Sequence, residues 1–207
     1  MLACVSPIVM AAPAVAQDFD GGAWDKERFQ IRLRGIGVIP SDGGTTTIGG
    51  MPDAENAVVP EFDISYFITR NIALELILAT SPHDIRLNNS AVGDLDLGDT
   101  MVLPPTLTLQ YHFNRDAPFS PYIGAGVNYT ITYAEDPGAD TARLKAGNSF
   151  GVAVQAGADI WLNDHWGINI DAKKIWLDVS ASVNGGAITG TVKLNPWVIG
   201  GGIAYRF

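Results

Sequence analysis

Hydrophobic and polar residues alternate most clearly over the last twelve residues of the chain, 196–207. Every second side chain from Trp197 to Tyr205 and Phe207 is apolar apart from one glycine, and the positions between them are small, aliphatic or, at Arg206, charged. A β-strand rises about 3.3 Å per residue and points successive side chains to opposite faces. Its terminal aromatic residues therefore lie roughly a membrane thickness apart, as in the aromatic girdles of transmembrane barrels. The pattern predicts a lipid-facing strand, although the edge of a soluble β-sandwich would share it.

The same alternation recurs in seven earlier segments of the chain. Their ranges are 29–39, 58–68, 72–81, 104–113, 122–135, 149–162 and 166–179. Four long connectors, at 40–56, 82–103, 137–147 and 180–190, alternate with three short turns, at 69–71, 114–120 and 163–165. Transmembrane barrels follow this rule, with short periplasmic turns and long external loops. We therefore predict an all-β fold, an eight-stranded antiparallel transmembrane β-barrel.

Charged residues fall on the strand face opposite the aliphatic residues, which in a barrel is the lumen. A polar interior would disrupt a sandwich core but suits a narrow barrel, and buried charges need partners of the opposite sign. We predict a lumen ion network of Arg32, Arg34, Asp63, Asp159, Asp171 and Arg206. The predicted channel lining is Ile36, Val38, Phe67, Glu75, Ile77, Trp161 and Lys173, with Trp161 as an alternative plug at the periplasmic base.

Composition supports a membrane barrel and excludes some partners. The chain has 207 residues, enough for one domain, and is 47% hydrophobic and only 17% charged. Beyond the N-terminus, no uncharged apolar run reaches the 18 or more residues of a membrane helix. The net charge of −9 argues against nucleic-acid binding, which needs a basic face. Acidic residues gather in the expected loops, where ordinary solvated charge is favoured over divalent-cation binding near lipopolysaccharide.

The N-terminus has the pattern of a secretory signal. Residues 1–16 are uncharged and apolar and end in the A-x-A sequence of a signal-peptidase site, but a positively charged n-region is missing, so the signal is expected to start upstream or to be incomplete. We expect 17–28 to form a periplasmic N-terminal segment and 29–207 the barrel. The single cysteine, Cys4, lies in the predicted signal, so the mature chain is expected to have no disulfide.

Four motifs in order resemble the OmpW family of small outer-membrane proteins. They are NIALEL (71–76), LPPTL (103–107), PYIGAGVNY (121–129) and NPWV with the terminal YRF (195–198 and 205–207). The resemblance implies an eight-stranded barrel with a narrow, partly hydrophobic channel that lets small hydrophobic molecules cross the outer membrane of Gram-negative bacteria. It also implies that Phe207 is the signal read by the barrel-assembly machinery. Lys173 departs from the family, in which its position can carry a bulky apolar residue.

Pro104 and Pro105 mark a candidate lateral opening. Proline lacks the N–H that a sheet ladder needs, so two in succession should interrupt pairing at the outer end of their strand. One hypothesis is that an apolar solute leaves the lumen there for the outer leaflet. The alternative is that the pair only ends a loop and begins a strand.

No residues are predicted to be catalytic, to bind a cofactor or to bind a metal. Outer-membrane lipid A hydrolases and acyltransferases need a Ser or His dyad at the barrel rim. His83 and His165 lie in connectors, and His112 points inward with Asn114, not serine, two residues on. We therefore predict no enzyme, with outer-membrane lipid, lipopolysaccharide, small hydrophobic solutes and the assembly machinery as partners. The predicted function is a channel for small hydrophobic molecules; the alternative is a plugged structural, adhesive or receptor barrel that acts through its external loops.

Overall fold

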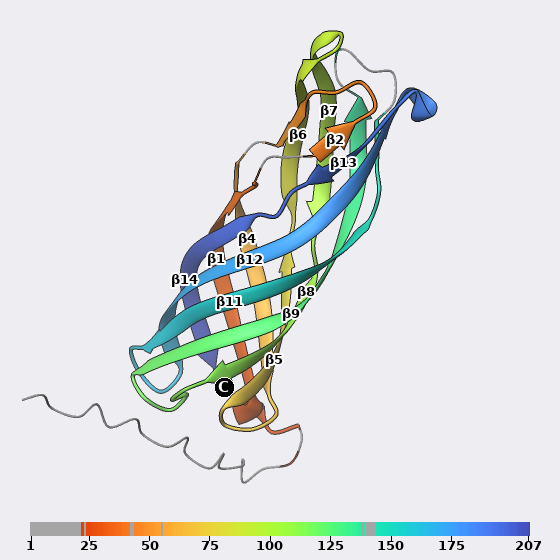
Figure 1. Cartoon of the computed structure of the whole chain (residues 1–207). Coiled ribbons are helices and arrows are strands. Elements are labelled where there is room, and N and C mark those ends of the chain that lie inside the picture. The colour runs from red at the N-terminus through yellow and green to blue at the C-terminus, as the bar shows by residue number, and fades with distance from the viewer. Residues whose placement is uncertain (1–21, 23, 42–43, 55, 138, 140–143) are drawn as a thin grey trace, which may run out of the picture.

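The computed structural model describes residues 22, 24–41, 44–54, 56–137, 139 and 144–207, which form a β-barrel (Figure 1). The predicted signal at 1–16 lies outside the described residues, and 17–28 is described only from 22 onward. Among the described residues, no helix is long and apolar enough to cross a membrane. The described part of the chain contains two single-turn 3₁₀ helices, η1 (Lys26–Arg28) and η2 (Asn184–Gly186).

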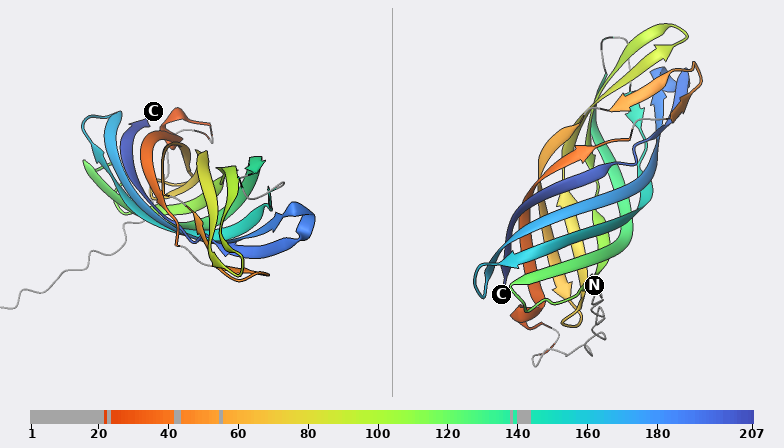
Figure 2. Two further views of the ribbon diagram at one scale, coloured as in Figure 1. Left: turned by 90° about the horizontal axis from the view of Figure 1, so that it is seen from above. Right: turned by 60° about the vertical axis from the view of Figure 1, so that its left-hand side comes forward.

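Eight antiparallel strands close the barrel, as the alternating pattern predicted. In order around the barrel they are β14 (Trp197–Arg206), β1 (Phe29–Ile39), β4 (Ala57–Phe67), β5 (Ile72–Ala79), β8 (Thr106–His112), β9 (Phe119–Pro137), β11 (Ser149–Trp161) and β12 (Trp166–Val183). β12 pairs with β14 and completes the circle. The strands run obliquely around the barrel, and the C-terminus lies at the end with the short turns (Figure 2).

The expected long loops contain further strands, which extend the wall above the barrel. They are β2 (Gly44–Thr46), β3 (Met51–Ala54), β6 (Ser81–Ser90), β7 (Gly93–Leu103), β10 (Leu144–Ala146) and β13 (Ile188–Lys193). The prediction of a loop at 82–103 is wrong, because these residues belong to a hairpin of β6 and β7. Its alternating apolar residues bury Leu87 and Leu97 against Ile85 and Leu95, and the hairpin pairs backbone groups that a loop would leave to water.

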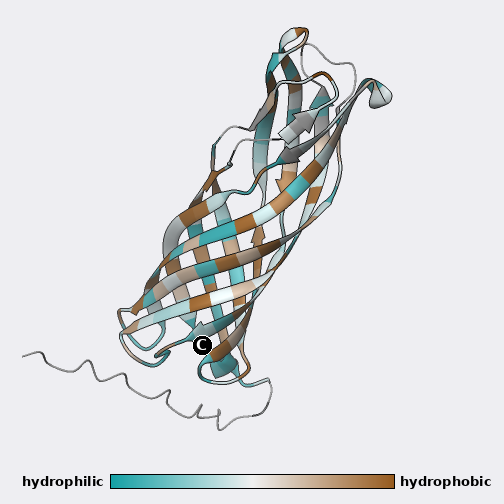
Figure 3. Ribbon diagram, viewed as in Figure 1, coloured by the Kyte–Doolittle hydropathy of each residue, from teal (hydrophilic) through white to brown (hydrophobic). Residues whose placement is uncertain are grey.

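Hydrophobic and hydrophilic residues alternate along the spanning strands (Figure 3), and many large apolar side chains on these strands are exposed, in agreement with the predicted lipid-facing pattern. On β14, the outward side chains of Trp197, Ile199 and Ile203 are each about half exposed. Aromatic side chains gather near both ends of the spanning strands. Tyr205 packs edge-on against Trp166, with ring centroids 4.7 Å apart, at the end with the short turns. At the other end lie Trp176, Trp197, Phe150 and Tyr129, all exposed. The two groups have the arrangement of membrane girdles.

The lumen has a polar lower half and an apolar upper half. Charged and amide side chains fill the half nearer the short turns, and they are almost completely buried. Above them, aliphatic residues of five barrel strands and β10 form one cluster: Ile36, Val59, Ala146, Ala153, Ile175, Leu177, Val179 and Val198. Both halves arise from the inward positions of the same strands, so the change from charged to aliphatic residues along each strand sets the boundary.

Candidate functional site

Arg32 on β1 is the centre of the polar half of the lumen. Its Nη1 donates hydrogen bonds to Asp63 Oδ1 at 3.1 Å, Ser65 Oγ at 3.0 Å and Glu75 Oε1 at 3.0 Å. Its Nε and Nη2 reach the two carboxylate oxygens of Asp159 at 3.0 and 2.8 Å, a bidentate pair. All of these side chains are inaccessible to solvent or nearly so. One guanidinium thus ties four strands together across the barrel.

Arg34 lies one inward position further along β1 and binds a second set of carboxylates. Its Nη2 lies 2.8 Å from Glu61 Oε1 and 2.7 Å from Asp63 Oδ2. Its Nη1 donates to Asn169 Oδ1 at 3.1 Å. Asp63 therefore stands between the two arginines and couples their ion pairs. The contacts of Arg34 Nη2 are ion pairs by distance, whereas its Nη1 makes a charge-assisted hydrogen bond, a stronger kind than a neutral one.

Lys173 on β12 completes the network at its upper surface. Its Nζ lies 3.0 Å from Glu61 Oε1 and 2.8 Å from Asp171 Oδ1. The Tyr122 hydroxyl donates to Asp171 Oδ2 at 2.8 Å. Lys173, the residue expected to depart from the family resemblance, thus forms buried ion pairs.

The structure brings together five of the six residues predicted for the ion network and adds others. Glu75 and Lys173, predicted as channel lining, belong to the network, and Lys173 also lines the cavity above it. Glu61, Tyr122 and Asn169 were not among the predicted site residues, although their inward positions follow from the alternation of their strands. In all, three cations, Arg32, Arg34 and Lys173, meet five carboxylates, Glu61, Asp63, Glu75, Asp159 and Asp171.

The predicted place of Arg206 in this network is wrong. Arg206 is the last residue of β14, so its side chain lies at the periplasmic rim. There its Nε donates to the Asp164 carbonyl at 2.8 Å and its Nη1 to the Arg115 carbonyl at 3.0 Å. Its guanidinium lies 4.2 Å from the centre of the Trp161 ring. It closes the base of the barrel and does not reach the carboxylates.

Phe67 and Trp161, both predicted to line the channel, instead make cation–π contacts with arginine side chains. The guanidinium of Arg115, in the turn after β8, lies 4.3 Å from the centre of the Phe67 ring. The guanidinium of Arg206 lies over the Trp161 ring in the same way. Burial of the Arg115 guanidinium lowers its pKa to about 10, so it remains charged at neutral pH. Phe67 and Trp161 therefore lie at the base, below the network, as the alternative interpretation of Trp161 proposed.

Above the network lies an apolar chamber. Ile36, Val38 and Ile77, all predicted as channel lining, face it together, and Glu61 and Lys173 form its floor. Its volume is about 60 Å³. A second cavity of about 30 Å³ lies further out and shares His83, Val102, Thr130 and Leu194 with the first. A water needs roughly 10–15 Å³ of such space, so the chamber fits only a slender molecule unless side chains move.

The barrel wall is interrupted beside this chamber, at Pro104 and Pro105. Pairing of β5 with β8 stops at Ile77 and Thr106, and pairing of β6 with β7 starts at Ser81 and Val102. Between these points, the described residues show no ladder pairing of 78–80 with 103–105. Inside the wall, Asn128 Nδ2 donates to the Pro104 carbonyl at 3.2 Å. We call this interruption the seam.

The seam lies at the outer girdle and borders the chamber. Pro104 and Thr106 line the chamber, and the Tyr129 backbone N–H donates to the Pro105 carbonyl at 3.0 Å. Tyr129 itself belongs to the outer aromatic group. On the outer surface, the hydroxyls of Thr80 and Tyr133 are 2.6 Å apart. A path from the chamber through the seam would therefore reach the lipid just below the outer interface.

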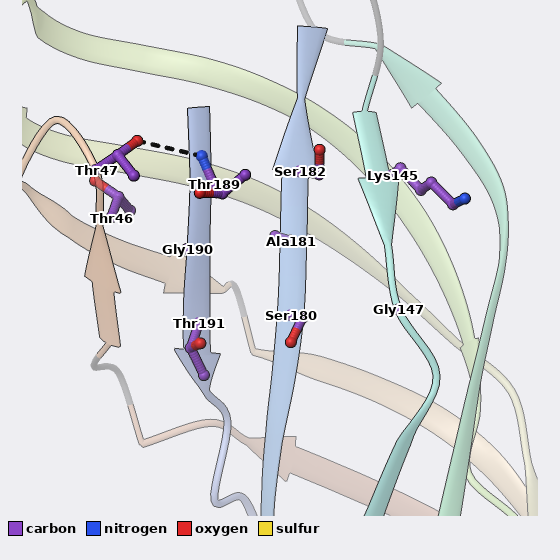
Figure 4. A pocket seen from close by; sticks show the side chains of 10 residues that line it. All are labelled: Thr46, Thr47, Lys145, Gly147, Ser180, Ala181, Ser182, Thr189, Gly190 and Thr191. Atoms are coloured by element: carbon purple, nitrogen blue, oxygen red, sulfur yellow. Dashed lines mark hydrogen bonds between the residues drawn. The ribbon is translucent and has the colours of Figure 1, made fainter. Parts of the chain in front are cut away.

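The short strands β2, β3, β6, β7, β10 and β13 form an extension of the wall above the barrel. A separate hollow lies on the outer face of this extension (Figure 4). Its lining is mostly hydroxyl-bearing, with Thr47, Ser180, Ser182, Thr189 and Thr191, and includes Lys145. Their neighbours Ala146 and Val179 belong to the buried core, and successive strand residues face opposite sides. The hollow therefore opens away from the lumen.

These features define the chain as a transmembrane β-barrel with a buried ion network in its lower lumen, an apolar upper chamber and an interrupted wall. The model of the OmpW family matches residues 25–207, and the chain belongs to that family. It is 42% identical to an uncharacterized outer-membrane protein of Sinorhizobium fredii, over 96% of this chain and 88% of that protein. It is 32% identical to outer membrane protein W of Escherichia coli K12, over 97% and 99%.

Solved structures agree with this assignment. The crystal structure of the outer membrane protein OprG from Pseudomonas aeruginosa aligns with a TM-score of 0.80 at 28% identity, covering 86% of this chain and 95% of that one. The solution structure of Escherichia coli outer membrane protein W aligns with a TM-score of 0.58 at 31% identity, covering 87% and 97%. The protein is an integral protein of the outer membrane.

Proposed function

We propose that this barrel carries small hydrophobic molecules from the exterior into the outer leaflet, through the apolar chamber and out of the seam. The observation that carries the proposal is that the chamber ends on a charged floor and borders the interrupted wall. An apolar solute moving downward would have to separate buried ion pairs, which costs several kcal/mol. The sideways route meets no such barrier, and it bypasses the polar lipopolysaccharide layer.

A relative supports an apolar solute. The dibenzothiophene metabolism operon protein PahQ of Pseudomonas aeruginosa is 32% identical over 139 residues, which are 67% of this chain and 65% of that protein. Dibenzothiophene is a hydrophobic aromatic compound, so the name links this kind of barrel to apolar substrates. In this proposal Ile36, Val38 and Ile77 line the path, Pro104 and Pro105 form the exit, and Phe207 is the signal for the barrel-assembly machinery.

The function is tested by filling the chamber. The indole of Ile77→Trp would occupy the space that the solute needs. If solute and indole together overpack the chamber at about 1–3 kcal/mol, solute occupancy, and with it entry of an apolar dye precursor into liposomes, falls by roughly tenfold. Leu76→Trp is the matched control, because Leu76 lies on the same strand and faces lipid. Equal flux through both variants and the unchanged protein would refute the chamber as the path.

The exit is tested separately at the seam. Replacing Pro104 and Pro105 by valine and threonine restores two backbone N–H groups, so the ladder between β5 and β8 can extend and uptake of the apolar solute should slow several-fold. Pro121→Val is the control, since Pro121 lies in β9, paired with Ala158 away from the seam. Unchanged uptake in a folded double variant would rule out lateral exit and leave only the lumen.

A plugged barrel acting through its exterior is the second candidate function. The observation in its favour is the dense lower lumen, where the ion network and the two cation–π contacts fill the cross-section. In that case the extension formed by β2, β3, β6, β7, β10 and β13 would carry the activity. The liposome measurement separates the two functions, because a plugged barrel gives no more apolar flux than empty liposomes.

A further inference from the structure

The floor of the chamber presents two polar atoms that lack a full set of partners. Glu61 Oε1 is bound by Arg34 and Lys173, whereas its Oε2 has no hydrogen bond among the described residues. Lys173 Nζ makes two hydrogen bonds, to Glu61 and Asp171, although an ammonium has three donors. Glu61 and Lys173 are each about 2% exposed. One acceptor and one donor thus lie side by side in residues that line the bottom of an apolar space.

We propose that Glu61 and Lys173 select solutes that carry a hydroxyl at one end of a slender apolar body. The hydroxyl would donate to Glu61 Oε2 and accept from Lys173 Nζ, while the apolar body lies against Ile36, Val38 and Ile77. This inference rests on the proposed function of the chamber and names its substrate class. A buried polar group that finds its partner only in the correct ligand is a strong source of selectivity.

The charge of the ion network decides which polar end group of a solute can bind at the chamber floor. Five carboxylates face three cations in the ion network as a whole, so the network beneath the chamber has a formal excess of negative charge. A carboxylate ligand would add to that excess and would be repelled. An ammonium ligand has no acceptor for the remaining Lys173 donor. A pure hydrocarbon offers no partner to Glu61 Oε2 or to the third N–H of Lys173. A neutral hydroxyl, which both donates and accepts, satisfies the two atoms without adding charge.

Lys173 supplies the donor of this selectivity. A bulky apolar residue at this position would offer a solute no donor. Lys173 instead extends from β12 across to Glu61 on β4 and remains buried. We expect a chain with an apolar residue at this position to bind hydrocarbons and alcohols of equal size alike.

The test is a binding measurement on the full chain in lipid nanodiscs. Toluene, benzyl alcohol, benzylamine and benzoate share one ring and differ in the polar end. Occupancy is followed from the NMR shifts of the isoleucine methyl groups of Ile36, Ile77 and Ile175, which line the chamber, with empty nanodiscs correcting for partition into lipid. We expect benzyl alcohol to bind roughly tenfold more tightly than toluene, as a hydrogen bond to charged groups allows, with benzylamine and benzoate weaker than the alcohol.

Two variants locate the selectivity. Glu61→Gln combined with Lys173→Met removes one charge of each sign, and it should make toluene and benzyl alcohol bind equally. Lys174→Met is the control, because Lys174 binds the Asn195 carbonyl and the Ser41 hydroxyl outside the chamber. If the double variant does not fold, the four-probe comparison on the unchanged protein still decides.

Each outcome has a distinct meaning. Equal binding of toluene and benzyl alcohol to the unchanged protein would overturn the hydroxyl selectivity and leave the proposed function standing. Tighter binding of benzoate or benzylamine would also overturn it. If no probe shifts the chamber methyl groups, the chamber is not a binding site and the proposed function itself fails.

Discussion

Replacing Arg32 by alanine is expected to lower the free energy of unfolding by about 3–5 kcal/mol, the usual cost of removing one partner from a buried ion pair. The reason is that Arg32 is bound to Asp63, Glu75 and Asp159 at once, at 2.8 to 3.1 Å and without contact with solvent. Without the guanidinium, three carboxylates remain buried beside one another. Urea unfolding of the barrel in lipid vesicles, followed by tryptophan fluorescence, measures the loss.

Arg70→Ala is the control for Arg32→Ala. Arg70 and Asp116 form an ion pair at 3.2 Å in the periplasmic turns, with 29% and 55% of the side chains exposed. Exposed pairs contribute about 0–1 kcal/mol, so this variant should unfold almost like the unchanged protein. A loss below about 1 kcal/mol for Arg32→Ala as well would mean that the lumen network does not stabilise the barrel through Arg32.

The network also explains why the lumen holds charges at all. A buried ion pair is seldom more stabilising than apolar residues of the same size, so the cross-barrel pairs are not needed for stability alone. They fill the lower lumen with charged groups, with which an apolar solute can form no hydrogen bond or ion pair. In the proposed function, this barrier directs a solute in the chamber toward the seam, and the same charges supply the polar floor.

Alternation along the strands was enough to predict the barrel and most of the network. Arg32, Arg34 and Asp63 could be placed in the lumen because each lies opposite lipid-facing residues on its own strand, and a barrel has only two faces. The seam could be anticipated from Pro104 and Pro105, since a missing N–H is a property of the residue itself.

Positions along the barrel axis were harder to predict than faces. Arg206 and Asp171 both point into the lumen, yet Arg206 lies at the rim and Asp171 lies in the network. Which side chains meet depends on their positions along the barrel axis and on the tilt of their strands, which alternation does not give. Phe67 and Trp161 were placed in the channel for the same reason. The β6–β7 extension was missed because its turn-forming Gly, Asn and Asp residues hid a short apolar alternation, Ile85 with Leu87 and Leu95 with Leu97.

Gly202→Ala is expected to prevent most of the chain from reaching the folded barrel. Gly202 on β14 is paired with Arg34 on β1, and a Cβ added there would lie 2.6 Å from the Arg34 Cα, and closer still to the Leu33 carbonyl oxygen. These are backbone atoms, so no side-chain rotation relieves the clash. The β1–β14 contact would have to open, which exposes unpaired backbone groups to lipid at several kcal/mol each.

The neighbouring strand provides a matched control in Gly35→Ala. A Cβ at Gly35 would meet nothing within 4 Å, and Gly35 is paired with Gly201 on the same two strands. The fraction of folded barrel is read from the shift in gel mobility between unheated and boiled samples after refolding into vesicles. We expect Gly35→Ala to match the unchanged protein and Gly202→Ala to remain largely unfolded. Similar folded fractions for the two variants would show that the barrel tolerates separation of β1 from β14, and that this contact is not as tight as the structure has it.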